Sequence, residues 1–157
     1  MKKKIVYING YKGENSSKAV LLKDKFDAIH IVLKDDFNPK EVCESLERIQ
    51  PDITIASSTG CYVADACSYD KGIFIYLNPL VELNDLAKLT DTTKLKDLKP
   101  ISKNTLVLIN IDDEILDHRK IVLKYSNYKV FKKGGHRFKN FDDLVDVINN
   151  LKYKYKT

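Results

Sequence analysis

The sequence predicts an α/β fold: a doubly wound, mostly parallel sheet of about six strands, in a single domain over residues 1–157. Two features of the chain support this prediction. Short apolar runs rich in β-branched residues alternate with amphipathic helical patterns, which is the order expected of strand-helix-strand units. Several of the runs are apolar at consecutive positions, as strands must be when helices cover both faces of a sheet.

Each expected strand is bounded by Gly, Pro, Asn or Asp, which end regular structure. The strands are expected at residues 4–8, 28–33, 53–56, 72–77, 106–110 and 128–131. The amphipathic patterns between them predict helices at residues 17–25, 39–49, 62–69, 114–125 and 141–152. Two of these helices carry start signals, Asn38-Pro39 for the second and Asp112-Asp113-Glu114 for the fourth.

Residues 79–100 interrupt this alternation, because leucines there are mixed with Thr, Asp and Lys. We expect a helix followed by a connecting loop, lying over the carboxyl edge of the sheet, where α/β proteins place their sites. Such a segment would act as a minimal lid. Its apolar residues are Leu80, Val81, Leu83, Leu86 and Leu89.

The composition is that of an ordinary globular protein, with 43% hydrophobic and 31% charged residues, and it excludes wholesale disorder. Lys and Arg number 27 against 22 Asp and Glu, a net charge of +5. The lysines are spread along the chain apart from residues 2–4 and the tail at 152–156. We therefore expect a solvated surface with a basic tail, and no nucleic-acid partner.

The cysteines Cys43, Cys61 and Cys67 lack Cys-x-x-Cys spacing, so they predict neither a metal site nor a disulfide framework, and a reducing compartment fits them best. The apolar run after the first lysines is too short for a signal peptide, and no other run approaches the length of a membrane span. We expect a cytoplasmic protein with no membrane partner. The oligomeric state is not readable from the sequence.

The segment Ala56-Ser57-Ser58-Thr59-Gly60 follows a buried strand and leads into a helix, which is the layout of a nucleophile elbow. Such turns need tiny flanking residues so that strand and helix can approach closely, and Ser58 occupies the apex. A serine at this place is also a common helix cap. The choice of a nucleophile depends on an acid and a histidine in later segments.

Both follow in the expected chain order. The strand at 106–110 leads into Asp112-Asp113, and the strand at 128–131 leads through two glycines to His136. The order Ser, Asp, His is typical of α/β-hydrolases. We prefer Asp113 as the acid, with Asp112 as the alternative. The other histidines, at positions 30 and 118, lie in an apolar strand and on an expected helix, which favours structural or surface roles.

Backbone N–H groups of Tyr11 and Thr59 are candidates for an oxyanion hole, because both follow strand ends at the same sheet edge. Asn9, Gly10, Tyr62 and Asn78 are candidate residues of the substrate pocket, although Asn78 with its following proline can equally shape a strand end. Cys61 lies inside the helix after the elbow, where a buried packing role is expected.

At these residues the chain resembles the small YqiA/YcfP-like esterases of the α/β-hydrolase superfamily. The resemblance spans nearly the whole chain. The matching segments are Tyr7-Ile8-Asn9-Gly10-Tyr11, Ser16-Ser17-Lys18-Ala19, Ala56-Ser57-Ser58-Thr59-Gly60-Cys61-Tyr62, Asn78-Pro79, Asp113-Glu114-Ile115-Leu116-Asp117-His118-Arg119 and Gly134-Gly135-His136-Arg137-Phe138.

The resemblance implies a compact α/β-hydrolase fold with a minimal lid. It implies Ser58 as nucleophile, Asp113 as acid and His136 as base in the hydrolysis of small carboxylic esters or thioesters. No metal or organic cofactor is implied. The expected partner is a small-molecule acyl ester or thioester substrate.

The chain departs from the family pattern at three positions and in two shortened segments. Asn9 replaces a histidine, and Ala56 and Cys61 replace glycines. The loop before His136 is one residue shorter, and the region at residues 79–100 is shorter than in typical members. These departures motivate a second hypothesis, a hydrolase-fold protein that has lost turnover and acts as a binding or interaction module. A third is a flavodoxin-like domain that binds a mononucleotide at the point where strand order reverses.

Overall fold

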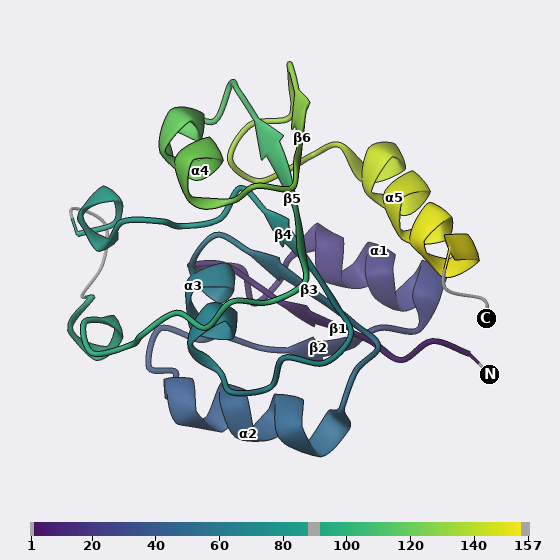
Figure 1. Ribbon diagram of the computed structural model, residues 1–157, viewed down its shortest axis with the longest axis horizontal. Helices are drawn as coiled ribbons and strands as arrows, with labels where there is room; N and C mark the ends of the chain where they lie inside the picture. Colours follow the sequence, from purple (N-terminus) through teal and green to yellow (C-terminus); the bar gives the residue numbers. More distant parts are fainter. Residues whose placement is uncertain (1, 88–91, 155–157) are drawn as a thin grey trace.

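The computed structural model describes residues 2–87 and 92–154. Its centre is a six-stranded sheet in the order β2-β1-β3-β4-β5-β6, in which every neighbouring pair is parallel (Figure 1). The strands are β1 (Ile5–Ile8), β2 (Ile29–Ile31), β3 (Ile53–Ser57), β4 (Ile73–Leu77), β5 (Thr105–Asn110) and β6 (Tyr128–Phe131). The predicted fold class is confirmed, and each strand lies within two residues of its expected bounds.

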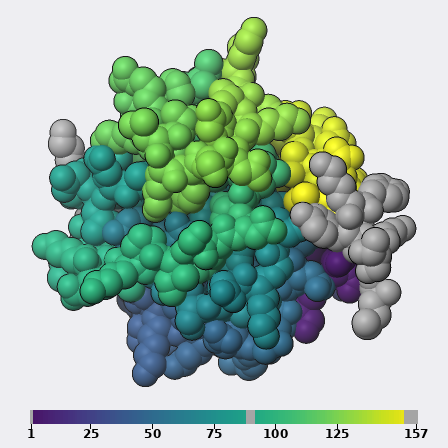
Figure 2. Space-filling view, viewed as in Figure 1, coloured from purple at the N-terminus to yellow at the C-terminus, as the bar shows by residue number. Residues whose placement is uncertain are grey.

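Helices cover both faces of this open sheet (Figure 1). They are α1 (Ser17–Phe26), α2 (Pro39–Ile49), α3 (Thr59–Ala66), α4 (His118–Lys124) and α5 (Phe141–Lys154). Residues alternate along β1 between two cores: Ile5 and Tyr7 pack with α1 and α5, whereas Val6 and Ile8 pack with α2, α3 and α4. Apolar contact on both faces explains why the strands read as continuous apolar runs. Later elements cover β1, and little of the purple N-terminal segment is visible in the space-filling view (Figure 2).

The parallel register aligns the carboxyl ends of the strands. Ser57 at the end of β3 pairs with Leu77 at the end of β4, and Asn110 at the end of β5 pairs with Phe131 at the end of β6. The loops that follow β3, β4, β5 and β6 therefore leave the sheet at one edge. All of the predicted catalytic residues lie on these loops.

The helix predicted within residues 79–100 is absent from the described part of that segment. Two short 3-10 turns replace it, η1 (Leu83–Asp85) and η2 (Thr93–Leu95). Leu80 and Leu86 pack with Leu116 in a small cluster beside the sheet edge. The segment is anchored by these apolar contacts, which need no helical periodicity. Residue 89 and the last part of the basic tail, residues 155–157, lie outside the described residues.

The helix predicted at 114–125 begins later, as α4 at His118. The side chain of Asp113 accepts hydrogen bonds from the N–H groups of Ile115 and Leu116, each at 2.8 Å, which closes a turn before the helix. Asp117 is the residue that caps α4, because its carboxylate accepts the N–H of Arg119 at 2.9 Å. The prediction was wrong because Asp113 closes a tight turn instead of starting the helix.

The expectation of unpaired cysteines was also wrong. Cys43 on α2 and Cys67 at the end of α3 form a disulfide, with their Cα atoms 5.0 Å apart. The two residues are 24 positions apart in sequence, and a spacing of that kind contains no pairing signal without the packing of α2 on α3. The inference of a reducing compartment from these cysteines has no support in the structure. None of the helices in the described part of the chain has the length and apolar character needed to cross a lipid bilayer.

Candidate active site

Ser58 forms a strained corner between β3 and α3. Its backbone has φ 48° and ψ −112°, a combination that residues with a side chain rarely adopt. The conformation is held by β4 and the segment after it: the N–H of Ser58 donates to the carbonyl of Leu77, and its carbonyl accepts from the N–H of Leu80, both at 3.1 Å. Its side chain makes no capping hydrogen bond to α3. The corner therefore has the geometry predicted for a nucleophile elbow.

Gly60 allows α3 to approach β1 at this corner. A Cβ atom added to Gly60 would lie 2.6 Å from the carbonyl oxygen of Asn9 and 2.8 Å from that of Ile8, too close for any real side chain. Ala56 and Cys61, on either side of the corner, are fully buried. Gly60 is thus the position at which only glycine fits the elbow.

His136 and Asp113 are paired. The Nδ1 atom of His136 lies 2.8 Å from Oδ2 of Asp113, and the Asp113 side chain is 1% exposed. Asp113 thus closes its own turn through Oδ1 and orients the imidazole through Oδ2. With the proton on Nδ1 directed at the carboxylate, the lone pair of Nε2 is available to act as a base.

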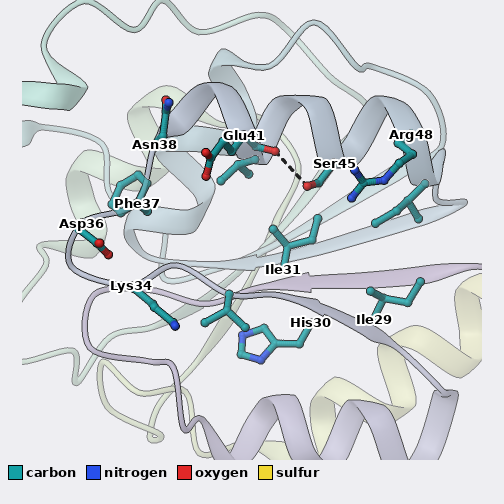
Figure 3. Close-up of a pocket in the computed structure, with 13 residues that line it drawn as sticks. Ile29, His30, Ile31, Lys34, Asp36, Phe37, Asn38, Glu41, Ser45 and Arg48 are labelled. Atoms are coloured by element: carbon teal, nitrogen blue, oxygen red, sulfur yellow. Dashed lines mark hydrogen bonds between the residues drawn. The ribbon is translucent and has the colours of Figure 1, made fainter.

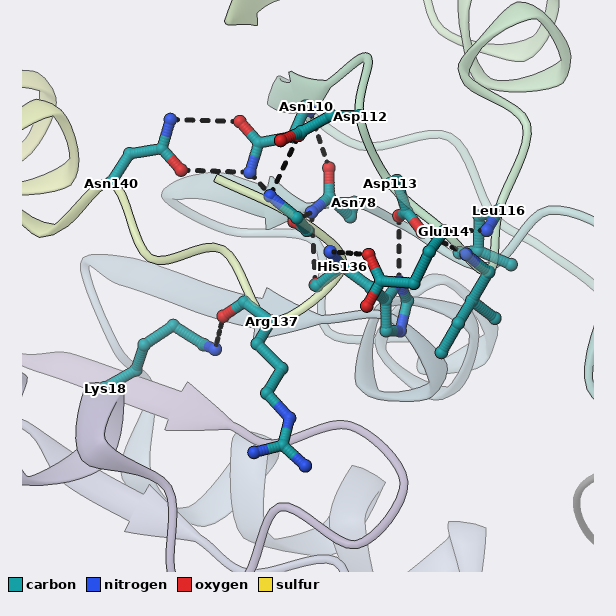
Figure 4. Close-up of polar contacts among 12 residues, drawn as sticks. Lys18, Asn78, Asn110, Asp112, Asp113, Glu114, Leu116, His136, Arg137 and Asn140 are labelled. Atoms are coloured by element: carbon teal, nitrogen blue, oxygen red, sulfur yellow. Dashed lines mark hydrogen bonds and ion pairs between the residues drawn. The ribbon is translucent and has the colours of Figure 1, made fainter. Parts of the chain in front are cut away.

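The two neighbouring carboxylates hold the backbone of the histidine loop (Figure 4). Asp112 accepts the N–H groups of Gly134 at 3.2 Å and Gly135 at 2.9 Å, and Glu114 accepts the N–H of His136 at 3.0 Å. Asp112, the alternative acid, therefore binds the loop backbone instead of the imidazole. The shorter loop still brings its histidine to Asp113, because both glycines adopt positive φ angles.

Three asparagines hold the other side of this loop (Figure 4). Asn78 donates to the carbonyls of Gly135 at 2.9 Å and His136 at 3.1 Å, and accepts the N–H of Asn110 at 2.8 Å. Asn110 and Asn140 exchange two side-chain hydrogen bonds, at 2.9 and 3.0 Å. Through these bonds, the ends of β4 and β5 fix the loop that carries His136.

Lys18 on α1 joins the same loop to the N-terminal half of the chain. Its ammonium donates a hydrogen bond to the carbonyl of Arg137, and the residue is buried (Figure 4). Burial first, and then the positive charge of Arg137, lower the pKa of the Lys18 ammonium to about 8. A buried cation of this kind is costly, so the contact with the loop carbonyl is part of its compensation.

The predicted hydrogen bond between Ser58 and His136 is not formed in this structure. The Ser58 hydroxyl is buried and has no hydrogen-bond partner, and Nε2 of His136 makes no hydrogen bond to any described residue. The two residues nevertheless flank the same backbone: Ser58 bonds to Leu77, and the next residue, Asn78, bonds to the carbonyl of His136. Ser58 and His136, the latter paired with Asp113, are thus both hydrogen-bonded to the end of β4.

The two predicted oxyanion donors lie on one small cavity of about 20 Å³. Tyr11 and Thr59 line it together with Gly10, whose added Cβ would lie 3.1 Å from Cβ of Ser58. Thr59 is the first residue of α3, and N–H groups at this position have no partner within their own helix. The structure therefore brings Gly10, Tyr11 and Thr59 to the space beside Ser58.

Two of the predicted pocket residues bind neighbouring backbone segments. Asn9 and Asn78 are fully buried. The Asn9 amide bonds to the backbone of Leu33 in both directions and accepts from His30 at 2.9 Å, which ties the end of β1 to the end of β2. Asn9 is thus held by hydrogen bonds to residues 21 and 24 positions away in the sequence. Tyr62 is half-buried and packs against Leu80 and its cluster under the lid segment.

The remaining reactive side chains are placed as expected. Cys61 is fully buried, and burial raises the pKa of its thiol well above the usual value, so it stays protonated. His30 stacks on Tyr7 with ring centroids 5.4 Å apart, and burial lowers its pKa. His118 starts α4. Among the described residues, no group of three or more His, Cys, Asp or Glu side chains is arranged to hold a metal ion.

A separate hollow of about 400 Å³ lies between the edge strand β2 and α2 (Figure 3). It is lined by Ile31, Glu41, Ser45 and Arg48 among others, and by none of the predicted site residues. The loop after β2, which includes Lys34 and Phe37, separates this hollow from the cavity beside Ser58, since both residues line each of them.

The residues that sequence reasoning missed are those that hold the histidine loop: Lys18, Asn110, Glu114 and Asn140. Their bonds join segments far apart in sequence and follow no periodic pattern. Asn110 alone had a usable signal, since a polar residue that closes an apolar strand next to an acid segment is placed at the sheet edge.

No protein-family model matches the chain, and a search of curated proteins found no match either. Several solved structures share its architecture. The esterase domain of a Rhodothermus marinus protein superposes with a TM-score of 0.68 at 12% identity, covering 92% of this chain and 82% of that one. Mouse α/β hydrolase domain-containing protein 10 superposes with a TM-score of 0.67 at 16% identity, covering 98% and 92%.

A third similar structure is a serine hydrolase without a lid from Xanthomonas campestris. It superposes with a TM-score of 0.58 at 13% identity, covering 96% of this chain and 81% of that one. Identities this low establish a common architecture alone. Together with the all-parallel sheet and its strand order, they show that the chain has the α/β-hydrolase fold.

Proposed function

We propose that this protein is a serine hydrolase that cleaves small carboxylic esters or thioesters through an acyl-enzyme intermediate. The observation that carries the proposal is the Asp113–His136 pair, held at the same sheet edge as the strained corner of Ser58. A backbone in this conformation is costly and persists where the surrounding structure enforces it, which is common at catalytic positions.

The proposed reaction follows from these positions. Ser58 Oγ attacks the carbonyl carbon while His136 Nε2 takes its proton, and Asp113 stabilises the imidazolium that results. The N–H groups of Tyr11 and Thr59 stabilise the negative oxygen of the tetrahedral intermediate. His136 then protonates the leaving alcohol or thiol. A water molecule next attacks the acyl-enzyme carbonyl: His136 takes the water proton and returns it to Ser58 Oγ as the acyl–oxygen bond breaks and the acid leaves.

The burial of the Ser58 hydroxyl means that substrate binding must accompany a local movement. Catalytic hydrogen bonds often tighten only in the substrate complex, so a rotation of the serine side chain toward His136 is consistent with the proposed reaction. The segment at 79–87 lies beside this corner, since the N–H of Leu80 donates to the carbonyl of Ser58. We expect this segment to move when substrate binds.

The experiment is hydrolysis of short acyl 4-nitrophenyl esters by the wild type and two serine variants. Ser58→Ala is expected to lower kcat/KM by about three orders of magnitude or more. The matched control is Ser57→Ala, whose hydroxyl bonds to that of Tyr7 at 3.0 Å and has no part in the proposed reaction. Equal rates for the wild type and Ser58→Ala would refute the function.

A second candidate is a catalytically inactive hydrolase fold that acts as a binding or interaction module. The unpartnered, buried Ser58 hydroxyl favours it, because this hydroxyl is not yet activated by a base. A fluorophosphonate probe separates the two candidates, since labelling at Ser58 requires an activated hydroxyl. Labelling that is abolished in Asp113→Asn supports the hydrolase; a folded wild type that is never labelled supports the module.

A further inference from the structure

The small cavity lined by Gly10, Tyr11 and Thr59 has both buried apolar residues and lysines in its lining. Its apolar wall comes from Leu33, Phe37 and Leu95, and its lysines are Lys12, Lys34 and Lys94. One carboxylate, that of Asp35, lines it as well, against three ammonium groups. The lysines come from three separate segments: the loop after β1, the loop after β2 and η2.

No salt bridge joins Lys12, Lys34 or Lys94 to a carboxylate among the residues that the structure describes. Lys12 and Lys34 are exposed, and Lys34 points away from α2 in Figure 3. Their charges are therefore available at the rim.

Lys94 is fixed by neutral partners. Its ammonium donates to the carbonyls of Asp35 at 2.8 Å and Phe37 at 3.1 Å, and lies 4.5 Å from the centroid of the Phe37 ring. These contacts use two of its three N–H groups, and no carboxylate of a described residue forms an ion pair with it. Holding a lysine in place by carbonyls and an aromatic ring positions a cation instead of cancelling it.

On the basis of the proposed function, we propose that the substrate is an ester or thioester with a small acyl group and an anionic leaving portion. The cavity, of about 20 Å³, has room for a small group such as a methyl. The charged portion of the substrate then lies at the rim, against the ammonium groups of Lys12, Lys34 and Lys94. Carboxylate and phosphate share this chemistry.

The effect expected of such a rim is faster and tighter capture of anionic substrates. Like-signed charges around a low-dielectric cleft raise the local concentration of a counter-charged ligand, and the gain decreases with ionic strength. A neutral ester of the same shape gains nothing from the lysines. The ratio of kcat/KM for matched anionic and neutral esters therefore isolates their contribution.

The test compares three acetate esters that differ only in one ring substituent: 3-acetoxybenzoate, 3-acetoxyphenyl phosphate and the neutral methyl 3-acetoxybenzoate. The wild type is expected to prefer an anionic ester by about tenfold at low salt, and less at high salt. The variant K12Q/K34Q is expected to lose most of this preference. The control K25Q/K71Q removes the same charge from exposed positions outside the cavity and is expected to keep it.

The outcomes separate the two proposals. Hydrolysis of all three esters without an anionic preference, or the same loss of preference in both double variants, refutes the anionic substrate and leaves the hydrolase intact. Preference for one anionic arm identifies carboxylate or phosphate.

If no ester is hydrolysed, the proposed function fails, and calorimetry with the full chain still tests the lysines. Binding of 3-hydroxybenzoate that exceeds binding of its methyl ester and is lost in K12Q/K34Q supports the anion site, and equal or absent binding of the two overturns it.

Discussion

The Nδ1 atom of His136 lies 2.8 Å from Oδ2 of Asp113, across 23 residues of sequence. The same carboxylate also closes the turn after β5, because its other oxygen accepts the N–H groups of Ile115 and Leu116. The turn and the imidazole thus share one side chain. Any displacement of the turn moves the orienting oxygen, and any displacement of the loop moves the base.

Replacing Asp113 with Asn is expected to reduce activity far more than stability. The amide oxygen can still accept the N–H groups of Ile115 and Leu116, so the turn is retained, but the side chain no longer stabilises an imidazolium or selects the tautomer. We expect kcat/KM for a short acyl ester to decrease by about 10³-fold or more, with the melting temperature nearly unchanged.

Asp112→Asn is the matched control, because Asp112 binds only the N–H groups of Gly134 and Gly135 and is exposed. Its expected effect is less than about tenfold. If both variants lose activity equally, the carboxylate at 113 has no special part in the reaction.

The asparagine pair behind the histidine loop is expected to act as one unit. Asn110 and Asn140 exchange two hydrogen bonds, so removing either side chain leaves the other with unsatisfied polar atoms. In a double-mutant cycle with alanine at both positions, we expect a coupling free energy of about 1–2 kcal/mol in unfolding. Each single variant should also lower kcat/KM, by about tenfold, through loss of His136 positioning. Additive effects on unfolding would contradict this arrangement.

Much of the fold was predictable because the burial of strands and helices determines which positions along the chain are apolar. The strand β3 reads as a continuous apolar run, since helices cover both of its faces, and its end was predicted at Ala56, one residue before the observed end at Ser57. Chain order then put Asp113 and His136 at the same sheet edge. The helix predicted within residues 79–100 was wrong for the described part of that segment, because Leu80 and Leu86 pack with the distant Leu116 without helical spacing. The Cys43–Cys67 disulfide and the asparagine network join distant segments, and no local pattern encodes such contacts.

Gly60→Ala is expected to be strongly destabilising. The new methyl group would lie 2.6 Å from the carbonyl oxygen of Asn9 and 2.8 Å from that of Ile8. Both oxygens belong to the backbone, so the contacts are relieved only if α3 separates from β1. We expect a loss of about 2–3 kcal/mol or more in urea unfolding. Gly10→Ala is a graded comparison, because its closest contact, with Cβ of Ser58, is 3.1 Å. A larger loss for Gly10→Ala than for Gly60→Ala would show that the approach of α3 to β1 is not the limiting contact.

Reduction of the Cys43–Cys67 disulfide is expected to lower stability without unfolding the chain. The bridge closes a loop over a sequence separation of 24 residues, and in the chain-entropy model a loop of this size contributes about 3 kcal/mol. For a chain of this length that corresponds to a decrease of roughly 6–12 °C in melting temperature on adding a reductant. The double variant C43A/C67A should show no response to the reductant. A wild type that is equally insensitive would indicate that the two thiols are not paired.

The buried ammonium of Lys18 predicts a specific pH dependence of stability. Its pKa is about 8 in the folded chain against 10.5 for an ordinary lysine, with burial as the main cause. The unfolded chain therefore binds more protons than the folded chain between these values, and the free energy of unfolding rises with pH through that window.

Relative to Lys18→Met, which has no titrating group, the wild type should gain about 1–2 kcal/mol between about pH 7.5 and 9.5. Urea unfolding at both pH values measures this difference, with the exposed Lys25→Met as a control that should show none. An unchanged difference between wild type and Lys18→Met would mean that the Lys18 ammonium remains hydrated, and that the contact with the Arg137 carbonyl does not bury its charge.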